Sequence, residues 1–115
     1  RAADRFLTAS SYLVARLTGR PVIDRYTAAA WAPLYDLEAQ DWAAESFGIC
    51  SRDRLAECLW PDEPAGRLTD EAAAATGLAP GTLVAAGTAD AAAEAVAAGV
   101  LSPGDMLVMY GSSIS

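Results

Sequence analysis

The sequence contains no lysine and no histidine, and it is short of positive charge altogether. Its eight basic residues, all arginines, stand against fifteen aspartates and glutamates, which gives a formal net charge of −7. The arginines are scattered along the chain, and none follows Arg67. Because binding to a nucleic-acid backbone requires clustered positive charge, we expect no nucleic-acid partner.

Cysteine is also scarce, with Cys50 and Cys58 as the only two. Their spacing fits neither a CxxC motif nor a zinc cluster, and no histidine is present to complete one. We therefore expect two buried or half-buried thiols in a cytoplasmic protein and no metal held by protein ligands.

Long hydrophobic runs are missing as well. The longest apolar tract, residues 91–101, is mostly alanine and contains Glu94, so it is too short and too polar to span a bilayer. No charged-then-apolar signal segment opens the chain. We expect no membrane partner.

What the chain does have is enough apolar material for a core. It has 115 residues, of which 53% are hydrophobic, and this suits one domain or a large piece of one. It starts at Arg1 directly before a helical pattern and stops at Ser115 just after an apolar run and a small-residue turn. We interpret the sequence as a piece of a larger protein.

Helical patterns dominate residues 1–82. The spacing of apolar residues predicts a helix over 4–17 that ends at Gly19, followed by an extended stretch and then a helix over 25–31 capped by Asp24. Further helices are expected over 41–48, 52–59 and 69–77. The segment between them, 60–66, is expected to be a loop because it contains two prolines and a glycine.

The pattern changes over residues 83–115. Short apolar runs at 82–86 and 106–110 predict two buried strands, and the alanine-rich segment 91–98 between them predicts a helix. A polar turn follows each run. Two strands that bring polar turns to the same end of a sheet commonly form a site for a phosphorylated ligand.

Asp90 follows the first of these strands and falls at the start of the alanine-rich helix. A helix N-terminus stabilises a carboxylate there, so composition alone favours an ordinary capping residue. Two functional interpretations stay open: a base that takes a proton from a substrate hydroxyl, or a ligand of metal-bound water.

The turn after the second strand is Gly111-Ser112-Ser113. It is either a plain turn or a phosphate-binding turn, because glycine allows close backbone approach and two hydroxyls can donate to phosphate oxygens. The three tryptophans, Trp31, Trp42 and Trp60, either stack on a sugar or pack in the core, and packing is the favoured interpretation.

Taken together, the residues resemble the FGGY family of carbohydrate kinases, which includes xylulokinases, ribulokinases and glycerol kinases. The resemblance depends on an ordered series of short motifs with matching gaps over nearly the whole chain. In order, they are Phe6-Leu7, Tyr12-Leu13, Leu17-Thr18-Gly19, Asp24 with Thr27 and Ala29, Leu34-Tyr35-Asp36, Trp42, Gly48-Ile49, Gly66-Arg67-Leu68-Thr69, Ala72-Ala73, Thr76-Gly77-Leu78, Pro80-Gly81-Thr82-Leu83-Val84, Gly87-Thr88-Ala89-Asp90, Gly99-Val100, Pro103-Gly104-Asp105 and Gly111-Ser112-Ser113.

The resemblance implies an α/β fold of the actin-like (RNase H-like) ATPase type, with two lobes and a cleft between them. It assigns residues 1–82 to the later part of the first, sugar-binding lobe, and residues 83–115 to a strand-helix-strand crossing into the second, ATP-binding lobe. We expect a helix-rich first part and a short sheet near the C-terminal end.

Carried over by position, the resemblance makes Asp90 the catalytic base and places Thr88 and Ala89 beside it as substrate-binding residues. It places Gly111, Ser112 and Ser113 on a loop that binds the phosphates of ATP. The implied reaction is transfer of the γ-phosphate of ATP, with Mg²⁺, to a hydroxyl of a sugar or polyol, with a pentulose favoured. A homodimer of the full-length protein is compatible with it.

Three residues depart from the family pattern. Ser112 replaces a usual threonine, Ala91 stands where many members have asparagine or glutamine, and Ile114 replaces a small residue. These departures bear on substrate identity more than on reaction type. The changes at Ala91 and Ile114 also leave open a non-catalytic sensor or scaffold. A third possibility is a helical support domain with no site of its own. The family's first phosphate loop and adenine pocket lie outside these residues, so we expect this polypeptide alone to be inactive.

Overall fold

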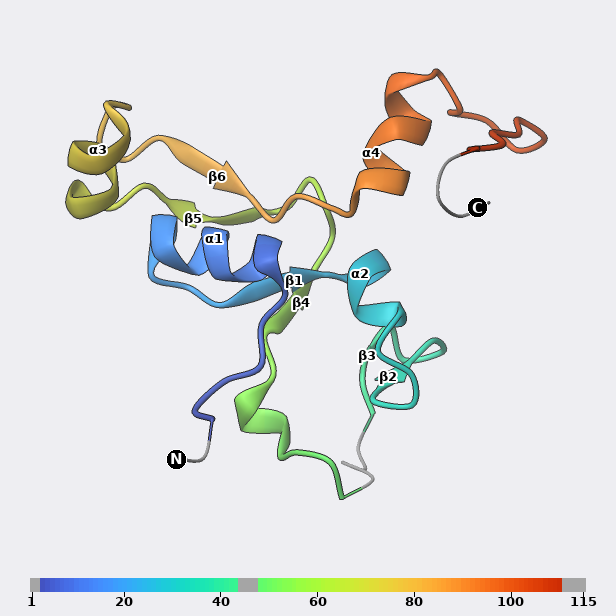
Figure 1. Cartoon of the computed structure of the whole chain (residues 1–115), viewed down its shortest axis with the longest axis horizontal. Helices are drawn as coiled ribbons and strands as arrows, with labels where there is room; N and C mark the ends of the chain where they lie inside the picture. The colour runs from blue at the N-terminus through green and yellow to red at the C-terminus, as the bar shows by residue number, and fades with distance from the viewer. Residues whose placement is uncertain (1–2, 44–47, 111–115) are drawn as a thin grey trace.

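The computed structural model describes residues 3–43 and 48–110, and it contains both helices and strands along most of that length (Figure 1). Its helices are α1 (Ala9–Thr18), α2 (Arg25–Ala29), the 3₁₀ helix η1 (Arg52–Arg54), α3 (Asp70–Thr76) and α4 (Asp90–Ala97). Its strands are β1 (Val22–Asp24), β2 (Tyr35–Asp36), β3 (Asp41–Trp42), β4 (Glu57–Leu59), β5 (Pro64–Arg67) and β6 (Leu83–Ala85).

The described strands form three separate two-stranded sheets. β1 and β4 pair in parallel, with Asp24 opposite Leu59, whereas β2 pairs with β3 and β5 pairs with β6 in antiparallel fashion. Parallel pairing of β1 with β4 requires a long crossover, and here the crossover contains α2, β2, β3 and η1. The end of β1 is therefore fixed by a segment far along the chain.

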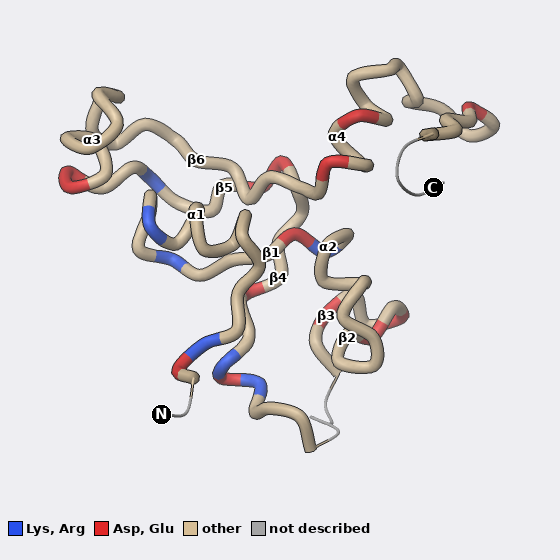
Figure 2. Tube along the Cα trace, in the orientation of Figure 1, with Lys and Arg blue, Asp and Glu red and all other residues tan. Residues whose placement is uncertain are grey.

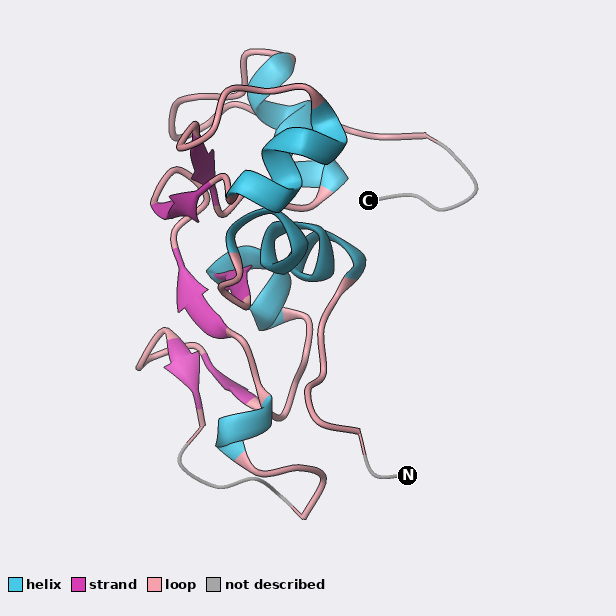
Figure 3. Cartoon of the chain, turned by 90° about the vertical axis from the view of Figure 1, so that its left-hand side faces the viewer, coloured by secondary structure: helices cyan, strands magenta, loops and turns pink. Residues whose placement is uncertain are grey.

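α1 packs against β1, β5, β6 and α3, and together they form one side of the molecule (Figures 1 and 3). Buried apolar side chains gather in three clusters, of which the largest surrounds Trp42 and includes Ile23, Ala28 and Cys58. α4 has no buried residue and lies at the far end of the molecule from α3. Among the described helices, only α4 and the three-residue η1 contain no buried residue.

Several predicted helix boundaries are confirmed. Gly19 and Gly77 adopt left-handed backbone conformations at the ends of α1 and α3, with φ of 77° and 76°. Asp24 and Thr69 cap α2 and α3 with their side chains. These signals are local, because a capping oxygen or a glycine acts on the adjacent turn of the same helix.

The predicted start of the first helix is wrong. α1 begins at Ala9 and not at residue 4, because Thr8 is its N-cap and accepts a hydrogen bond from the Ser11 amide at 3.2 Å. The amide of Phe6 instead donates to the Arg54 carbonyl oxygen at 2.9 Å. This long-range hydrogen bond keeps Phe6 outside α1.

The helices predicted over 41–48 and 52–59 are also wrong. Residues 41–42 form β3, and residues 57–59 form β4 after the short η1. The indole Nε1 of Trp42 donates to the Ala56 carbonyl oxygen at 2.6 Å, which ties the two segments together in an extended arrangement. Residues 44–47 of the helix predicted over 41–48 lie outside the described residues.

The loop predicted over 60–66 ends in a strand. β5 begins with Pro64, a position where the missing amide hydrogen is tolerated, and it continues through Gly66. A Cβ atom on Gly66 would lie 3.0 Å from the Cβ of Thr18, so the absence of a side chain lets β5 approach α1 closely. The proline and the glycine therefore permit the strand here.

Of the two strands predicted to bear polar turns, only the first is present. β6 forms as predicted, but it pairs with β5, and Leu83 is exposed although we expected it to be buried. Residues 106–109 form no strand, and Met106 is 82% exposed. A parallel strand needs a neighbour along its edge, and none of the paired strands extends to this segment.

The charges are divided along the chain. Figure 2 shows acidic residues along the whole chain, but on α4 and on the described chain after it no arginine accompanies them, because the arginines all lie on the earlier elements. α4 thus presents a negatively charged, exposed surface.

Within residues 3–43 and 48–110, no helix reaches the length and apolarity that crossing a membrane would require.

Candidate functional site

The turn between β6 and α4 carries three predicted site residues, Thr88, Ala89 and Asp90. β6 ends at Ala85, and Gly87 then adopts a φ of 74°, which turns the chain toward the helix. Ala89 is the N-cap of α4, and its carbonyl oxygen accepts the Ala93 amide at 3.1 Å. Asp90 is therefore the first residue of the helix, where its sequence position predicted it.

Asp90 does not cap the helix in the usual way. The N-cap position belongs to Ala89, and among the described residues the Asp90 Oδ1 accepts from the amide of its neighbour Ala91, at 2.9 Å. The side chain is exposed and belongs to none of the ion pairs found among the described residues. A carboxylate in this position is accessible to a ligand and can accept a proton from a hydroxyl group.

Thr88 makes a contact that connects distant parts of the chain. Its Oγ1 donates to Oδ2 of Asp24 at 3.0 Å, and the same Oδ2 accepts from the Thr27 amide at 2.9 Å. Asp24 is only 2% exposed, so its carboxylate is buried at the junction of β1 and α2. One oxygen thus caps α2 and also holds the turn before Asp90.

Backbone hydrogen bonds fix the same turn on its other side. The Ala86 amide donates to the Glu63 carbonyl oxygen at 3.0 Å, and the Gly87 amide donates to the Pro61 carbonyl oxygen at 3.1 Å. Residues 86–88 are therefore held by the turn between β4 and β5 as well as by β1. We call residues 86–88, with these three hydrogen bonds, the anchored turn.

The second group of predicted site residues, Gly111, Ser112 and Ser113, lies outside the described residues. The structure therefore brings Thr88, Ala89 and Asp90 together on one turn, and the assignment of the phosphate turn stays a prediction.

An apolar pocket of about 500 Å³ lies beside the anchored turn. Its lining comes from α2, the start of the β4–β5 turn, the anchored turn and α4, and consists of Tyr26, Trp60, Pro61, Thr88, Ala92, Ala93 and Val96. The guanidinium carbon of Arg25 lies 5.3 Å from the ring centroid of Trp60, a cation–π arrangement. An apolar pocket with one aromatic wall can accept the carbon face of a small ligand.

The tryptophans separate into two roles. Trp42 is buried, and Trp31 packs against it with ring centroids 5.8 Å apart, so both belong to the core as the favoured interpretation predicts. Trp60 is 44% exposed and lines the apolar pocket. Of the three, Trp60 has the most exposed ring beside the turn that carries Asp90.

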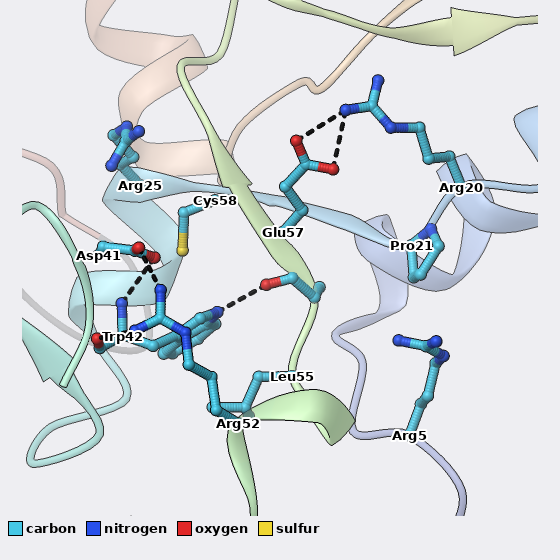
Figure 4. A pocket seen from close by; sticks show the side chains of 11 residues that line it. Arg5, Arg20, Pro21, Arg25, Asp41, Trp42, Arg52, Leu55, Glu57 and Cys58 are labelled. Atoms are coloured by element: carbon cyan, nitrogen blue, oxygen red, sulfur yellow. Dashed lines mark hydrogen bonds and ion pairs between the residues drawn. The ribbon is translucent and has the colours of Figure 1, made fainter. Parts of the chain in front are cut away.

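A second pocket, of about 380 Å³, is lined by arginines (Figure 4). Arg20 binds both carboxylate oxygens of Glu57, at 2.7 and 2.8 Å. Arg52 forms an ion pair with Asp41 and donates to the Trp42 carbonyl oxygen at 2.9 Å. These two arginines are thus engaged in holding β3 and β4 and are not free to bind an anion.

The acidic and thiol groups of this pocket have perturbed pKa values. Burial raises the pKa of Asp41, but hydrogen bonds from the Trp42 amide and from Arg52 outweigh it, so the pKa lies below its usual value. Burial and the neighbouring Asp41 raise the pKa of the Cys58 thiol to about 12. Cys58 is therefore a neutral, unreactive thiol at physiological pH, in agreement with the buried thiol expected from the sequence.

Metal ligation finds no support within the described part of the chain. No group of three or more histidine, cysteine, aspartate or glutamate side chains there could hold an ion. Asp90 is one carboxylate, and a single exposed carboxylate does not make a cation site.

Sequence reasoning identified Asp24 as a cap and Thr88 as a neighbour of Asp90, but it missed the bond between them. The two residues are 64 positions apart, and no spacing rule connects them. The arginine pocket was missed for the same reason, since Arg20 and Glu57 meet only through the parallel pairing of β1 and β4.

Comparison with known proteins identifies relatives of the chain. Residues 1–97 match the model of the FGGY family of carbohydrate kinases, N-terminal domain. A ribulokinase from Shouchella clausii (strain KSM-K16) is 38% identical over 121 residues, which cover 97% of this chain and 21% of that protein. A xylulose kinase from Klebsiella pneumoniae is 33% identical, with coverage of 96% and 23%.

A solved structure gives the same result. The crystal structure of xylulose kinase from Rhodospirillum rubrum matches with a TM-score of 0.88 and 32% identity, over 96% of this chain and 23% of that one. The predicted fold class and the predicted family resemblance are both confirmed by these matches. The chain spans about a fifth of the length of these relatives.

Proposed function

The chain belongs to the FGGY family of carbohydrate kinases, and we propose that the full-length protein transfers the γ-phosphoryl group of ATP to a hydroxyl of a sugar or polyol. The observation that carries this proposal is the carboxylate of Asp90. It is exposed at the start of α4, it makes no ion pair among the described residues, and the anchored turn precedes it.

In this mechanism Asp90 acts as the general base. The substrate hydroxyl gives its proton to the Asp90 carboxylate while its oxygen forms a bond to the γ-phosphorus. The bond between that phosphorus and the β,γ-bridging oxygen breaks, and ADP leaves with the electron pair. Phosphoryl transfer passes through a loose transition state, so the main contribution of the base is to orient the attacking oxygen.

Thr88 and Ala89 are proposed to contact the substrate beside the base. The Thr88 hydroxyl donates to Asp24, but a hydroxyl oxygen also has acceptor capacity. It can therefore accept a hydrogen bond from a sugar hydroxyl without losing Asp24. Both residues are half-buried, so they leave the carboxylate of Asp90 as the most accessible polar group of the turn.

A pentulose is the substrate class that we propose. The support is that two relatives, which this chain matches over nearly all of its length, are named ribulokinase and xylulose kinase. Neither comparison favours the alternative of a non-catalytic sensor or scaffold. The exposed position of Asp90 also speaks against a support domain without a site, in which that carboxylate would be buried in an ion pair.

The ATP side of the site is proposed for residues 111–113. Because no arginine or lysine follows Arg67, these residues would bind phosphate through hydroxyl and amide hydrogens. The described residues offer no ligand set for Mg²⁺, so we assign none of them to the ion.

We also propose the division into lobes expected from the sequence, with residues 1–82 in the sugar-binding lobe and 83–115 crossing to the ATP-binding lobe. The match to the N-terminal domain ends at residue 97, within this crossing, and thereby supports it. A cytoplasmic location and a homodimer of the full-length protein complete the proposal.

A substrate panel on the full-length protein tests the function. The protein is incubated with ATP and Mg²⁺ and with ribulose, xylulose, gluconate, glycerol or no acceptor, and ADP formation is followed. We expect ADP to form with a pentulose at rates well above those without an acceptor. Equal rates with and without every acceptor would reject the kinase assignment.

A further inference from the structure

The contact between Asp24 and Thr88 points to a role beyond the helix cap. We propose that Asp24 is a positioning residue for Asp90, because its buried carboxylate holds the Thr88 hydroxyl and so sets where α4 presents the Asp90 carboxylate. This inference rests on the proposed function, in which Asp90 is the base.

Asp24 is held firmly itself. It ends β1, whose other two residues, Val22 and Ile23, are buried and pair in parallel with β4. Its side chain is bound to the Thr27 amide at 2.9 Å. A carboxylate that is 2% exposed must be satisfied by hydrogen bonds, and Thr88 supplies one of the two that the Asp24 side chain accepts.

Asp90, in contrast, has no long-range anchor of its own within residues 3–43 and 48–110. There, its side chain accepts a hydrogen bond from its own neighbour, the Ala91 amide, and α4 buries none of its residues. The anchored turn therefore determines the position of the Asp90 carboxylate. Within that turn, Thr88 is the fixed residue nearest to Asp90 in the sequence and the only one fixed by its side chain.

The other two bonds of the anchored turn cannot replace this one. The amides of Ala86 and Gly87 are bound to the backbone of the β4–β5 turn, and they lie on the β6 side of Thr88. Beyond Thr88 only Ala89 separates the anchored turn from the base. Loss of the Thr88 hydroxyl would thus release the first turn of α4 while leaving β6 in place.

Side-chain variants of the full-length protein test this role. Thr88→Val keeps the shape and removes the donor, whereas Thr88→Ser keeps the hydroxyl. Asp24→Ser keeps a capping oxygen for α2 but is too short to hold Thr88 as well, whereas Asp24→Asn keeps an acceptor of the original reach. Thr82→Val is the matched control, because its exposed hydroxyl donates only to the Ala79 carbonyl oxygen before β6.

We expect Thr88→Val and Asp24→Ser to lower kcat by about tenfold to a hundredfold, as a small misplacement of a reacting group does. The KM for ATP should not change, and Thr82→Val should stay within about threefold of the parent protein. Thr88→Ser should recover most of the kcat that Thr88→Val loses, and Asp24→Asn most of the kcat that Asp24→Ser loses. Asp24→Ser supplies the same test if Thr88→Val does not fold. A kcat within about twofold of the parent in both variants would overturn the proposal.

A second measurement tests whether Thr88→Val lowers kcat by displacing the Asp90 carboxylate. In the background of Asp90→Asn, Thr88→Val should lower the residual kcat by less than about twofold, because residues that act as a unit are not additive. An equal loss in the presence and absence of the Asp90 carboxylate would show that Thr88 acts by another route and would overturn the proposal.

A third arm separates this inference from the proposed function. Hydrogen exchange of the Ala93 amide, which donates to the Ala89 carbonyl oxygen in the first turn of α4, should become about fivefold faster in Thr88→Val. Unchanged exchange would overturn the positioning role, whatever Asp90 does. Near-normal turnover of Asp90→Asn would instead reject the base assignment and leave the anchoring of the helix standing.

Discussion

Thr88 and Asp24 lie 64 positions apart in the sequence, and the hydroxyl of the first donates to the carboxylate of the second at 3.0 Å. The bond joins the carboxyl end of β1 to the turn that leads out of β6. The candidate site is therefore built where two segments from different sheets meet, with a buried acid behind the turn and an exposed acid, Asp90, in front of it.

Replacement of the buried acid should destabilise the protein. Asp24→Ala leaves the Thr27 amide and the Thr88 hydroxyl without their acceptor, and we expect it to lower the free energy of unfolding by about 2–4 kcal/mol. Asp36→Ala is the control, since the exposed Asp36 carboxylate accepts two amides in the same way and should cost about 1 kcal/mol. Urea denaturation measures both. Equal losses would show that burial of Asp24 adds nothing.

Removal of the proposed base should stop turnover without disturbing nucleotide binding. We expect Asp90→Asn to lower kcat by a factor of about 10² to 10⁴, the usual contribution of a general base, with an unchanged dissociation constant for ATP. Glu94→Gln removes the same charge from the same exposed helix and should leave kcat close to that of the parent. Steady-state kinetics with the best acceptor gives both values, and similar losses would point to charge alone.

The thiol of Cys58 should make stability depend on alkaline pH. Its pKa is raised from 9.0 to about 12 in the folded protein, so between these values the unfolded thiol loses its proton and the folded one keeps it. The unfolded state then binds fewer protons, and the free energy of unfolding falls as the pH rises through this window. Denaturation midpoints at pH 8.5, 9.5 and 10.5 should show the fall.

Cys58→Ala is the control for that pH dependence. Tyr35 adds a fall of the same sign, because burial chiefly raises its pKa as well, so the variant should flatten the pH dependence without abolishing it.

In the parent protein, iodoacetamide at pH 8.5 should modify the half-buried Cys50 first. Modification of both thiols at one rate would contradict the buried, neutral state of Cys58.

The tryptophans should differ sharply in their contributions to stability. Trp42→Ala opens the largest buried cluster and leaves the Ala56 carbonyl oxygen without its donor, and we expect a cost of about 3–5 kcal/mol. Trp60→Ala removes a half-exposed ring with one cation–π contact and should cost about 1 kcal/mol or less. Thermal denaturation of the two variants checks the order, and a larger loss for Trp60 would contradict these roles.

The polypeptide of residues 1–115 alone should not transfer phosphate. It spans about a fifth of the length of its relatives, and its described residues include no group that could hold a metal ion. With ATP, Mg²⁺ and each acceptor of the panel, ADP formation should equal that of the buffer. Acceptor-dependent ADP formation by this polypeptide would show that these residues suffice.

The parts of the fold that the sequence predicts correctly are those determined by neighbouring residues. Thr69 and Gly77 bound α3, Asp24 caps α2, and the alanine-rich segment after Ala89 forms α4. In each case a side-chain oxygen or a glycine acts on the adjacent turn. Such a signal is fully contained in a few consecutive residues.

The incorrect predictions lie where tertiary contacts override the local pattern. Leu55 and Leu59 have helical spacing, but β4 forms because residues 57–59 find β1 as a parallel partner. The sequence pattern predicts that Trp42 lies in a helix, but its indole Nε1 donates a hydrogen bond to the Ala56 carbonyl oxygen across the core. No local pattern reveals these pairings, because the partners are brought together by the rest of the chain.

The candidate site likewise has some features that the sequence predicts and others that only the tertiary structure shows. The position of Asp90 at the start of a helix after a strand follows from the sequence, and its family resemblance supplies the proposed role. Its exposure, the buried partner of Thr88 and the two backbone bonds of the anchored turn do not follow from the sequence. The environment of the proposed base therefore becomes evident only in three dimensions.

The anchored turn also imposes an order on folding. Its three hydrogen bonds reach Asp24, Pro61 and Glu63, so it cannot be completed before β1 has formed and the chain has closed the long loop that brings β4 alongside. Long-range closures of this kind are slow compared with helix formation. During refolding, helical signal should recover first and catalytic competence last, which makes recovered activity a sensitive measure of complete native assembly.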